Sequence, residues 1–333
     1  MSSVAVIGSG TWGTAIAHLI AGKNVAVRMW TRSADVADAI NAAHRNPRHL
    51  PDVELAGVTA SASFEESLRG VDAAIFVCPS SYLRSIALSC APFIASDLPV
   101  IVLTKGIEAQ TGFTMVELLE DVLGNPSRIA CLSGPNHAEE VSRGLPAATV
   151  VASSDEACSL YFQDLFNTSM FRVYTTSDVT GVELCAASKN VIAIANGMSV
   201  AMQLGDNASA SLMTRGLAEV TRLVVTEMAR LGMAMGSRHD TFAGLAGVGD
   251  LIATCSSEHS RNRALGSFLV EGGTLAAFEE KMQMVAEGAV ACKTVTELAR
   301  LHDVEMPIAE AVRQVLWEGR DPHEIIETLF ERP

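Results

Sequence analysis

Short apolar runs alternate with amphipathic segments through the first half of this 333-residue chain. Alternation of this kind predicts a parallel sheet whose strands are joined by right-handed helical crossovers. The segments with helical periodicity lie near residues 12–22, 34–43, 81–91, 113–123, 137–144 and 155–166. The runs that predict strands are Val4–Ile7, Val25–Trp30, Ala73–Cys78, Val100–Thr104, Arg128–Leu132, Ala148–Ala152 and Phe171–Thr175.

The pattern changes near residue 179, where the strand signal almost vanishes. Residues 182–202 form a long apolar run, and the sequence Asp321-Pro322-His323-Glu324 is typical of a capped helix start. One long amphipathic helix is predicted from Met213, Leu217, Val220, Val224, Met228 and Leu231. We therefore predict an α/β protein with an N-terminal parallel-sheet domain over residues 1–178 and an all-helical C-terminal domain over residues 179–333.

A glycine-rich turn, Gly8-Ser9-Gly10-Thr11-Trp12-Gly13, joins the first predicted strand to the first predicted helix. In a dinucleotide-binding crossover, Gly8 would allow the tight turn and Gly10 would let the backbone approach a pyrophosphate. Gly13 would bring helix and strand close together. This context predicts a Rossmann-type domain, and the alternative is a glycine-rich turn in an unrelated α/β protein.

The residues after the second strand bear on the choice of cofactor. An NAD-specific domain usually places Asp or Glu there to bind the ribose 2′-hydroxyl, whereas this chain has Thr31-Arg32-Ser33. An arginine and two hydroxyls can accommodate a 2′-phosphate, so Arg32 and Ser33 predict NADP as a cofactor alongside NAD. The alternative is that Arg32 is an ordinary solvated loop residue.

Two later strand ends carry further candidates. Lys105 follows one strand, and the carboxyl ends of strands in open α/β sheets are where ligands bind, so Lys105 is a candidate contact to substrate or nicotinamide. Ser133-Gly134-Pro135-Asn136-His137 follows the next strand and opens a helix, which offers backbone donors to an anion. The alternative for Lys105 is an ordinary solvated lysine at a strand end. His137 could act as an acid or base, and the alternative is a structural hydrogen bond at the helix start.

The helical half has its own charged candidates. Lys189-Asn190 lies in the long apolar helix, where a lysine is costly unless it is paired, functional, or extended to the surface along its stem. Downstream, Asp250 follows two glycines and can hold an ammonium group. Ser260-Arg261-Asn262 can grip a phosphate through Arg261, or can be a plain helix cap with a solvated face.

Composition narrows the function classes. The net charge of −14 argues against a general nucleic-acid or anionic-membrane partner, so local cations would have to attract an anionic ligand. The seven cysteines include no C-x-x-C pair and predict buried, reduced thiols, and the eight histidines are scattered, which argues against a metal site. We find no apolar stretch of membrane-spanning length and no signal sequence, and we expect a cytoplasmic protein.

An ordered series of motifs resembles the bacterial NAD(P)-dependent glycerol-3-phosphate dehydrogenase family. The likeness covers nearly the whole chain, and the ordered set is far more specific than any single motif. Its members are Gly8–Ala15, Thr104-Lys105-Gly106, Ser133-Gly134-Pro135, Lys189–Ala193, Gly244–Leu251, Ser260-Arg261-Asn262, Met306-Pro307-Ile308 and Glu318-Gly319-Arg320.

The resemblance implies a fold, a reaction and a set of site residues. It implies a Rossmann domain followed by a helical substrate domain. The implied reaction interconverts glycerol 3-phosphate and dihydroxyacetone phosphate and supplies glycerol 3-phosphate for glycerophospholipid synthesis. Lys189 would be the proton acceptor. The other substrate-binding candidates are Lys105, Gly134, Asn136, Asn190, Asp250, Ser260, Arg261 and Asn262; Asn136 stands where Ser or Thr is commoner. The cofactor-binding candidates are Gly8, Gly10, Thr11, Trp12, Gly13, Arg32, Ser33, Lys105, Ala138, Arg261, Val285 and Glu287.

In this reading Lys189 exchanges the substrate's hydroxyl proton. Burial and Lys105 would lower the pKa of Lys189, whereas Asp250 would raise it. Asp250 is therefore assigned to orientation, and ketone reduction is expected to be favoured at neutral pH.

Two alternative functions stay open: a related enzyme acting on a hydroxyacyl thioester or a sugar acid, and a non-catalytic dinucleotide sensor. A homodimer is plausible, but the apolar helices could also be satisfied within one chain.

Overall fold

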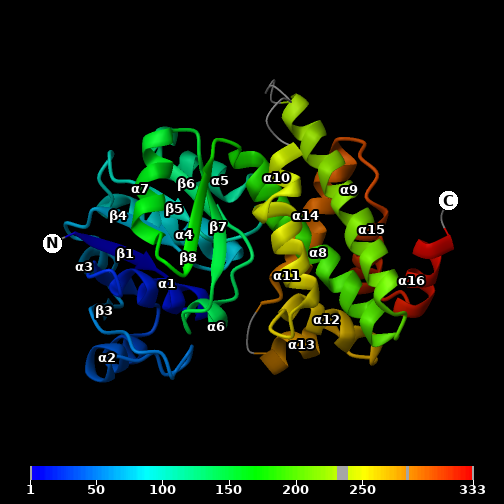
Figure 1. Ribbon diagram of the computed structural model, residues 1–333, viewed down its shortest axis with the longest axis horizontal. Coiled ribbons are helices and arrows are strands. Elements are labelled where there is room, and N and C mark those ends of the chain that lie inside the picture. The colour runs from blue at the N-terminus through cyan, green and yellow to red at the C-terminus, as the bar shows by residue number, and fades with distance from the viewer. Residues whose placement is uncertain (1, 231–238, 283–284, 332–333) are drawn as a thin grey trace. The chain divides into compact units, whose positions relative to one another are not determined.

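The computed structural model describes residues 2–230, 239–282 and 285–331 and contains two compact units (Figure 1). The first unit comprises residues 1–104 and 115–179, and the second comprises residues 105–114 and 180–333. The segment 105–114 lies inside the predicted N-terminal domain by sequence, yet it folds with the helical unit. Lys105 therefore belongs to the second unit.

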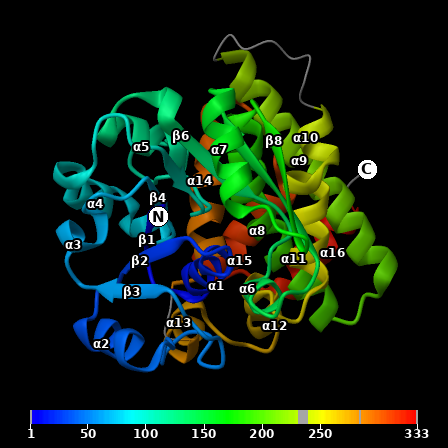
Figure 2. The same cartoon turned by 60° about the vertical axis from the view of Figure 1, so that its left-hand side comes forward.

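The first unit is built on an eight-stranded sheet with the order β3-β2-β1-β4-β5-β6-β7-β8 (Figures 1 and 2). The strands are β1 Ser3–Ile7, β2 Ala26–Trp30, β3 Val58–Ser61, β4 Ala73–Phe76, β5 Val100–Val102, β6 Ile129–Ser133, β7 Ala147–Ser153 and β8 Phe171–Thr176. Its helices are α1 Thr11–Ala21, α2 Ala34–Ala43, α3 Phe64–Leu68, α4 Ser80–Cys90, α5 Met115–Leu123, α6 Ala138–Val141 and α7 Glu156–Phe166, with short 3₁₀ turns at η1 Ala91–Phe93 and η2 Pro126–Arg128. All seven predicted strands form.

The chain runs outward from β1 in both directions along the sheet. Right-handed crossovers in opposite directions place their helices on opposite faces. Helix α1 contacts α6 and α7, and α4 contacts α3 and α5, as expected for two covering layers. Strands β1 and β4 are buried on both faces, which explains their uninterrupted apolar sequences.

The prediction of a wholly parallel sheet was wrong at one pair, because β7 runs antiparallel to β6. Residues 134–146 connect these strands and hold only α6, which has four residues. A helix of that length spans about 6 Å, whereas a five-residue strand spans about 16 Å. The four-residue α6 does not carry the chain back along β6, and β7 instead runs back alongside it, with Val150 opposite Ser133 and Ser153 opposite Ala130.

Two elements of the first unit were missed in the sequence. Strand β3 is an edge strand with only Val58 and Ala60 buried among its four residues, so it gives no apolar run. Helix α3 spans five residues, which is too short for helical periodicity to register. Its start is nonetheless capped, since the Ser63 side chain accepts the Glu66 N–H.

The second unit is all-helical. Its helices are α8 Val179–Ala201, α9 Asp206–Arg230, α10 His239–Ala243, α11 Asp250–Ser256, α12 Arg261–Val270, α13 Leu275–Met282, α14 Glu287–Leu301, α15 Pro307–Glu318 and α16 Pro322–Glu331, with one π-helical turn, η4 Leu245–Gly249. The predicted cap of α16 is present, because the Asp321 carboxylate accepts the His323 N–H. In the predicted long helix, Leu231 and the side chain of Met228 lie outside the described residues.

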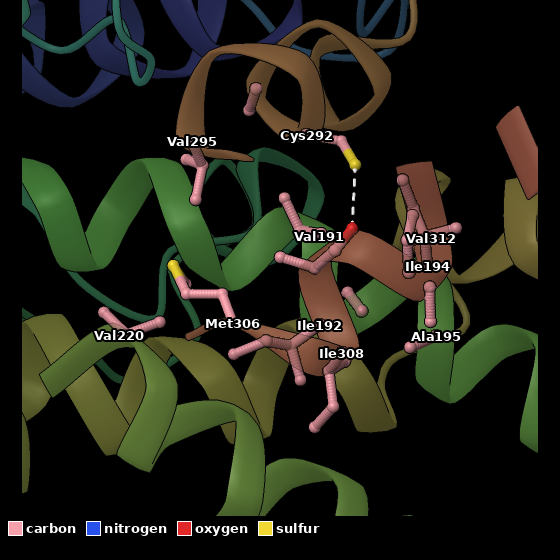
Figure 3. Close-up of a cluster of buried hydrophobic side chains, with 14 of the residues drawn as sticks. Val191, Ile192, Ile194, Ala195, Val220, Cys292, Val295, Met306, Ile308 and Val312 are labelled. Carbon is pink, nitrogen blue, oxygen red and sulfur yellow. Dashed lines mark hydrogen bonds between the residues drawn. The ribbon is translucent and has the colours of Figure 1, made fainter. Parts of the chain in front are cut away.

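Helix α8 is the centre of the second unit. Every residue from 181 to 199 is buried, so α8 is enclosed on all sides. Figure 3 shows Val191 and Ile192 among side chains of α9, α14 and α15. By length and composition α8 could cross a membrane, contrary to the expectation that no stretch is long enough. However, 89% of its apolar window is buried within the protein, as in the core helix of a soluble protein.

Two glycines set the distance between α8 and α12. A Cβ atom on Gly197 would lie 2.1 Å from the Arg263 carbonyl oxygen, and one on Gly266 would lie 2.1 Å from the Ile194 carbonyl oxygen. The two helix backbones therefore touch directly. This contact fixes the start of α12 relative to the residues of α8.

Candidate functional site

The glycine turn of the first unit lies between β1 and α1. Gly8 has φ +129°, and a Cβ atom there would lie 2.2 Å from the Val77 carbonyl oxygen. A Cβ on Gly13 would lie 2.1 Å from the Gly8 carbonyl oxygen, whereas one on Gly10 would meet nothing within 4 Å. The fold itself requires Gly8 and Gly13. Gly10 faces open space, which fits the close approach of a pyrophosphate.

The start of α1 suits an anion as well. Its N-cap residue, Gly10, makes no side-chain capping bond, and its first turn carries no acidic residue. The Asn46 amide nitrogen holds the turn by donating to the Ser9 carbonyl oxygen at 2.8 Å and to the Thr14 hydroxyl at 2.9 Å. The geometry is therefore that of a braced helix N-terminus on which a dinucleotide phosphate fits.

The loop after β2 holds Arg32 and Ser33. Arg32 is exposed, and the Ser33 hydroxyl donates to Asp35. Asp35 also accepts from Arg48 at 2.7 Å, and the Thr31 hydroxyl accepts from Ser9 at 2.8 Å. The two hydroxyls predicted for a 2′-phosphate are thus already bonded within the chain. Asp35 and Arg48 are neighbours that the sequence reasoning missed, because Arg48 comes from a loop 13 residues further on.

Gly134, Asn136 and Ala138 also belong to the first unit. A Cβ on Gly134 would lie 2.9 Å from the Thr149 Cα atom, so glycine is needed there for the approach of β7. The Asn136 amide nitrogen donates to the carbonyl oxygens of Pro135 and Ala148, and its buried amide oxygen has no hydrogen-bond partner among the described residues. Asn136 is thus arranged to accept a hydrogen bond through this oxygen.

In the second unit, one carboxylate lies between two ammonium groups. The Asp250 oxygens accept from Lys189 Nζ at 2.7 Å and from Lys105 Nζ at 2.7 Å. Lys189 Nζ also lies 2.6 Å from the Thr254 hydroxyl, which donates its own proton to the Asp250 carbonyl oxygen at 2.6 Å. We call these four residues the lysine–aspartate centre. Lys189 is buried, so the alternative that it extends to the surface is wrong.

Burial and the neighbouring charges set the protonation of this centre. Burial lowers the pKa of Lys189 to about 8; Asp250 opposes this shift and Lys105 adds to it. Burial alone would raise the pKa of Asp250, but Lys105 and Lys189 outweigh it and hold that pKa below its usual range. The carboxylate therefore stays ionised between two competing cations.

A distorted helix start positions Asp250. The π-helical turn η4 ends at Gly249, directly before Asp250 begins α11. A Cβ on Gly247 would lie 2.2 Å from the Phe242 carbonyl oxygen. The absence of a side chain on Gly247 therefore admits the chain's own backbone. Thr254 follows Asp250 by four residues and so shares its helix face, a spacing that could have identified Thr254 from the sequence.

The start of α12 lies beside the same part of α8. Ser260 is the N-cap, and its hydroxyl accepts the Arg263 N–H. Asn262 donates to the Asn190 amide oxygen at 2.9 Å. Arg261, which lies between Ser260 and Asn262 in the sequence, is exposed. The predicted pairs Lys189-Asn190 and Arg261-Asn262 are therefore brought together, although more than 70 residues separate Asn190 from Asn262.

The start of α14 packs on the same amide. A Cβ on Gly288 would lie 2.3 Å from the Asn262 amide oxygen. The predicted cofactor-binding residues Val285 and Glu287 are half-buried and directly precede this contact. The second unit thus gathers all of its predicted site residues around α8, α11 and the starts of α12 and α14.

Residues 2–230, 239–282 and 285–331 bring together no group of three or more His, Cys, Asp or Glu side chains able to hold a metal ion. All seven cysteines are buried and none is in a disulfide, in agreement with the sequence prediction. Cys255 lies near Lys189, and burial raises the pKa of its thiol to about 12, so it is an inert neighbour of the centre.

Two family models match the chain. Residues 3–159 match the NAD-dependent glycerol-3-phosphate dehydrogenase N-terminus, and residues 178–327 match the C-terminus of the same family. The glycerol-3-phosphate dehydrogenase [NAD(P)+] of Streptomyces griseus is 45% identical over 330 residues, covering 98% of this chain and 96% of the relative. A second relative with that name, from Salinibacter ruber, is 43% identical and covers 99% and 95%.

Solved structures agree with these matches. The crystal structure of glycerol-3-phosphate dehydrogenase from Coxiella burnetii has a TM-score of 0.92 and 35% identity, with 99% of both chains covered. A ketopantoate reductase from Ralstonia eutropha has a TM-score of 0.59 at 14% identity and shares the fold alone.

Proposed function

The chain belongs to the NAD-dependent glycerol-3-phosphate dehydrogenase family, and we propose that it interconverts sn-glycerol 3-phosphate and dihydroxyacetone phosphate with NAD or NADP. The observation that carries this proposal is the buried Lys189 ammonium, held 2.7 Å from Asp250 in a unit with no other comparably buried lysine among its described residues. A buried amine with a lowered pKa is suited to moving a proton to and from a substrate oxygen.

The glycine turn and the start of α1 would hold the cofactor's pyrophosphate. Gly8 and Gly13 shape the turn, and Gly10 leaves room for the phosphates. Bound nicotinamide supplies or accepts the hydride at ring carbon C4. Arg32 is assigned to the 2′-phosphate of NADP.

Lys189 is assigned as general acid and base. In the reduction direction its ammonium donates a proton to the oxygen at substrate C2 and stabilises the negative charge that develops there. With a pKa of about 8, most Lys189 side chains are protonated at neutral pH, which favours ketone reduction. Above that pH the neutral amine can accept the hydroxyl proton, which favours alcohol oxidation.

The other members of the centre orient this amine. Asp250 and Thr254 occupy two of the directions around Lys189 Nζ, and the third N–H direction, which has no hydrogen-bond partner among the described residues, is assigned to the substrate oxygen. Lys105 supplies a second positive charge near the same carboxylate. Arg261 and the backbone N–H groups at the start of α12 are assigned to the phosphate, which would counter the repulsion of the net charge of −14.

A substrate panel tests the assignment. We expect rapid NADPH oxidation with dihydroxyacetone phosphate, and background rates with acetoacetyl-CoA and with no substrate. Turnover of acetoacetyl-CoA would instead indicate a hydroxyacyl-type enzyme. NADPH binding without turnover of any ketone would indicate a dinucleotide sensor.

The same proposal extends to the setting of the enzyme. The reaction would supply glycerol 3-phosphate for glycerophospholipid synthesis in the cytoplasm, without membrane insertion, which fits the seven buried thiols outside disulfides and the buried α8. A homodimer is compatible with exposed apolar side chains such as Trp317, which is 48% exposed. Light scattering on the purified protein tests the dimer, and fractionation of cells that express it tests the location.

A further inference from the structure

We propose that Ile107 is a positioning residue that anchors the loop of residues 105–114 in the helical core and thereby keeps Lys105 on Asp250. This inference rests on the proposed function, since it concerns the same lysine–aspartate centre. We call residues 105–114 the Lys105 loop. Its significance is that Lys105 lies shortly after strand β5 of the first unit in sequence, yet its ammonium group is bonded in the second unit.

The Lys105 loop is inserted in sequence between two segments of the first unit. The chain leaves the first unit after Thr104 and rejoins it at Met115, so both ends of the loop connect to the sheet domain. The loop bonds to itself: the Glu108 N–H donates to the Phe113 carbonyl oxygen at 2.8 Å, and Ile107 pairs with Thr114 as an isolated bridge. The Thr111 hydroxyl donates to the Glu108 carboxylate at 2.6 Å. These bonds shape the loop, but they do not attach it to the helical unit.

Ile107 makes that attachment. It is 2% exposed, and every other buried member of its hydrophobic cluster lies between residues 184 and 329. Exposed residues, Ala109 to Gly112, form the loop's tip. A buried isoleucine side chain is therefore the loop's apolar anchor in the core, and it lies two residues from Lys105.

Gly106 connects the anchor to the lysine. Its φ of +153° lies outside the range that L side chains readily adopt, so this backbone conformation favours glycine. On either side of this glycine, the Ile107 side chain is buried in the core and Lys105 Nζ reaches Asp250 at 2.7 Å. Lys105 remains 22% exposed in its side chain, so its ion pair alone is open to competition from water.

Loss of the anchor has a chemical consequence. With the loop undocked, Asp250 would pair with Lys189 alone, and the repulsion from Lys105 that lowers the pKa of Lys189 would disappear. The pKa of Lys189 would then rise. Alcohol oxidation, which requires the neutral amine, would need a higher pH.

The first test reads the position of Lys105 without any turnover. Purified full-length wild type, Ile107→Ala and Ile326→Ala are treated with a small amine-acylating reagent, and modification of Lys105 is followed by peptide mass spectrometry. Ile326 is the matched control, because it is 1% exposed in the same core and lies on α16. We expect several-fold faster labelling of Lys105 in Ile107→Ala only. Equal labelling in both variants would overturn the proposal.

The second test is a double-mutant cycle in the dehydrogenase assay. Because misplacing a catalytic group by about 1 Å can cost about a hundredfold in rate, we expect Ile107→Ala to lower kcat/KM about tenfold or more. In a Lys105→Met background the same change should have almost no further effect, whereas Ile326→Ala should act equally in both backgrounds. An Ile107→Ala loss that persists in the Lys105→Met background would mean a merely structural role.

Two further measurements separate the possible failures. Ile107→Val keeps most of the anchor, so it should restore both slow labelling and near wild-type kcat/KM, while circular dichroism confirms that each variant folds. The pH midpoint of glycerol 3-phosphate oxidation should move upward in Ile107→Ala; an unmoved midpoint would contradict the proposal. If wild type does not turn over dihydroxyacetone phosphate, the proposed function fails, yet the labelling test still decides the role of Ile107.

Discussion

The two units differ in the charges that they offer to a ligand. At the start of α1 the first unit offers backbone N–H groups around three glycines, with no acidic side chain in the first helical turn. The second unit instead arranges ionisable side chains, two lysines on one buried aspartate. Backbone dipoles do not titrate, whereas a buried amine does. The first arrangement therefore suits binding at any pH, and the second suits moving a proton.

The difference also decides how each half responds to substitution. A change in the glycine turn should act by steric exclusion, because added atoms would occupy the proposed position of a phosphate or the position of the chain itself. A change in the lysine–aspartate centre acts through charge, because it alters the proton affinity of the remaining groups. The predictions below separate these two modes of failure.

The largest expected effect comes from Lys189→Met. This change removes the proposed acid and base, which should lower kcat by about a hundredfold to ten-thousandfold, while the dissociation constant for NADPH stays unchanged. Stopped-flow turnover and fluorescence titration measure the two quantities. Lys281→Met, on the surface of α13, is the control and should behave as wild type. If Lys189→Met kept more than about a tenth of the wild-type kcat, the acid–base assignment would be wrong.

Asp250→Asn should change the pH profile as well as the rate. The carboxylate is the group that raises the pKa of Lys189 against burial, so its removal should drop that pKa below about 8. The pH midpoint for alcohol oxidation should therefore move downward, and reduction should lose activity at neutral pH, by about tenfold to a hundredfold. Initial rates from pH 6 to 10 in both directions check this. A midpoint that stays in place or rises would show that Asp250 does not control the proton affinity of Lys189.

Two glycine substitutions probe the first unit. Gly10→Ala adds a methyl group into open space, so the melting temperature should stay at its wild-type value while the Kd for NADPH rises about tenfold, or about 1.4 kcal/mol. Gly13→Ala forces a Cβ against the Gly8 carbonyl oxygen and should also destabilise the fold by about 1–3 kcal/mol. Calorimetry and cofactor titration separate the two. Equal melting temperatures for both variants would contradict the geometry of the turn.

The sequence predicted the first unit's turn because its chemistry is local. Gly8, Gly10 and Gly13 stand within six residues, between a strand and a helix, and both elements form as expected. The wholly parallel sheet was wrong at β7 because strand direction depends on the length of the connecting helix, and periodicity placed a helix over residues 137–144 where only Ala138–Val141 is helical. Strand β3 was missed because an edge strand needs few apolar residues.

The lysine–aspartate centre could be predicted only in part. Asp250 could be suspected of holding an ammonium group, but three sequence segments meet there, and no local pattern specifies which lysine reaches it. Lys105 was expected at the sheet edge because it follows a strand. Its loop instead folds with the helices, since Ile107 is buried in their core. The family resemblance, rather than periodicity, brought these residues into one candidate set.

The smallest expected effect concerns the choice between NADP and NAD. Arg32 is exposed at the loop after β2, and hydrogen bonds to a charged group contribute about 1.5–3 kcal/mol, so Arg32→Ala should raise the KM for NADPH about tenfold or more. The KM for NADH should change little, because NADH has no 2′-phosphate. Arg45 is an exposed arginine that donates to the Pro51 carbonyl oxygen, so Arg45→Ala is the control for nonspecific loss of positive charge.

The Asp35 carboxylate, which accepts hydrogen bonds from Ser33 and Arg48, should limit the affinity for NADPH that Arg32 contributes, since it would repel the same phosphate. Asp35→Asn should therefore lower the KM for NADPH in the wild-type background. Equal effects of Arg32→Ala on both cofactors would remove Arg32 from the phosphate site and leave it a solvated loop residue.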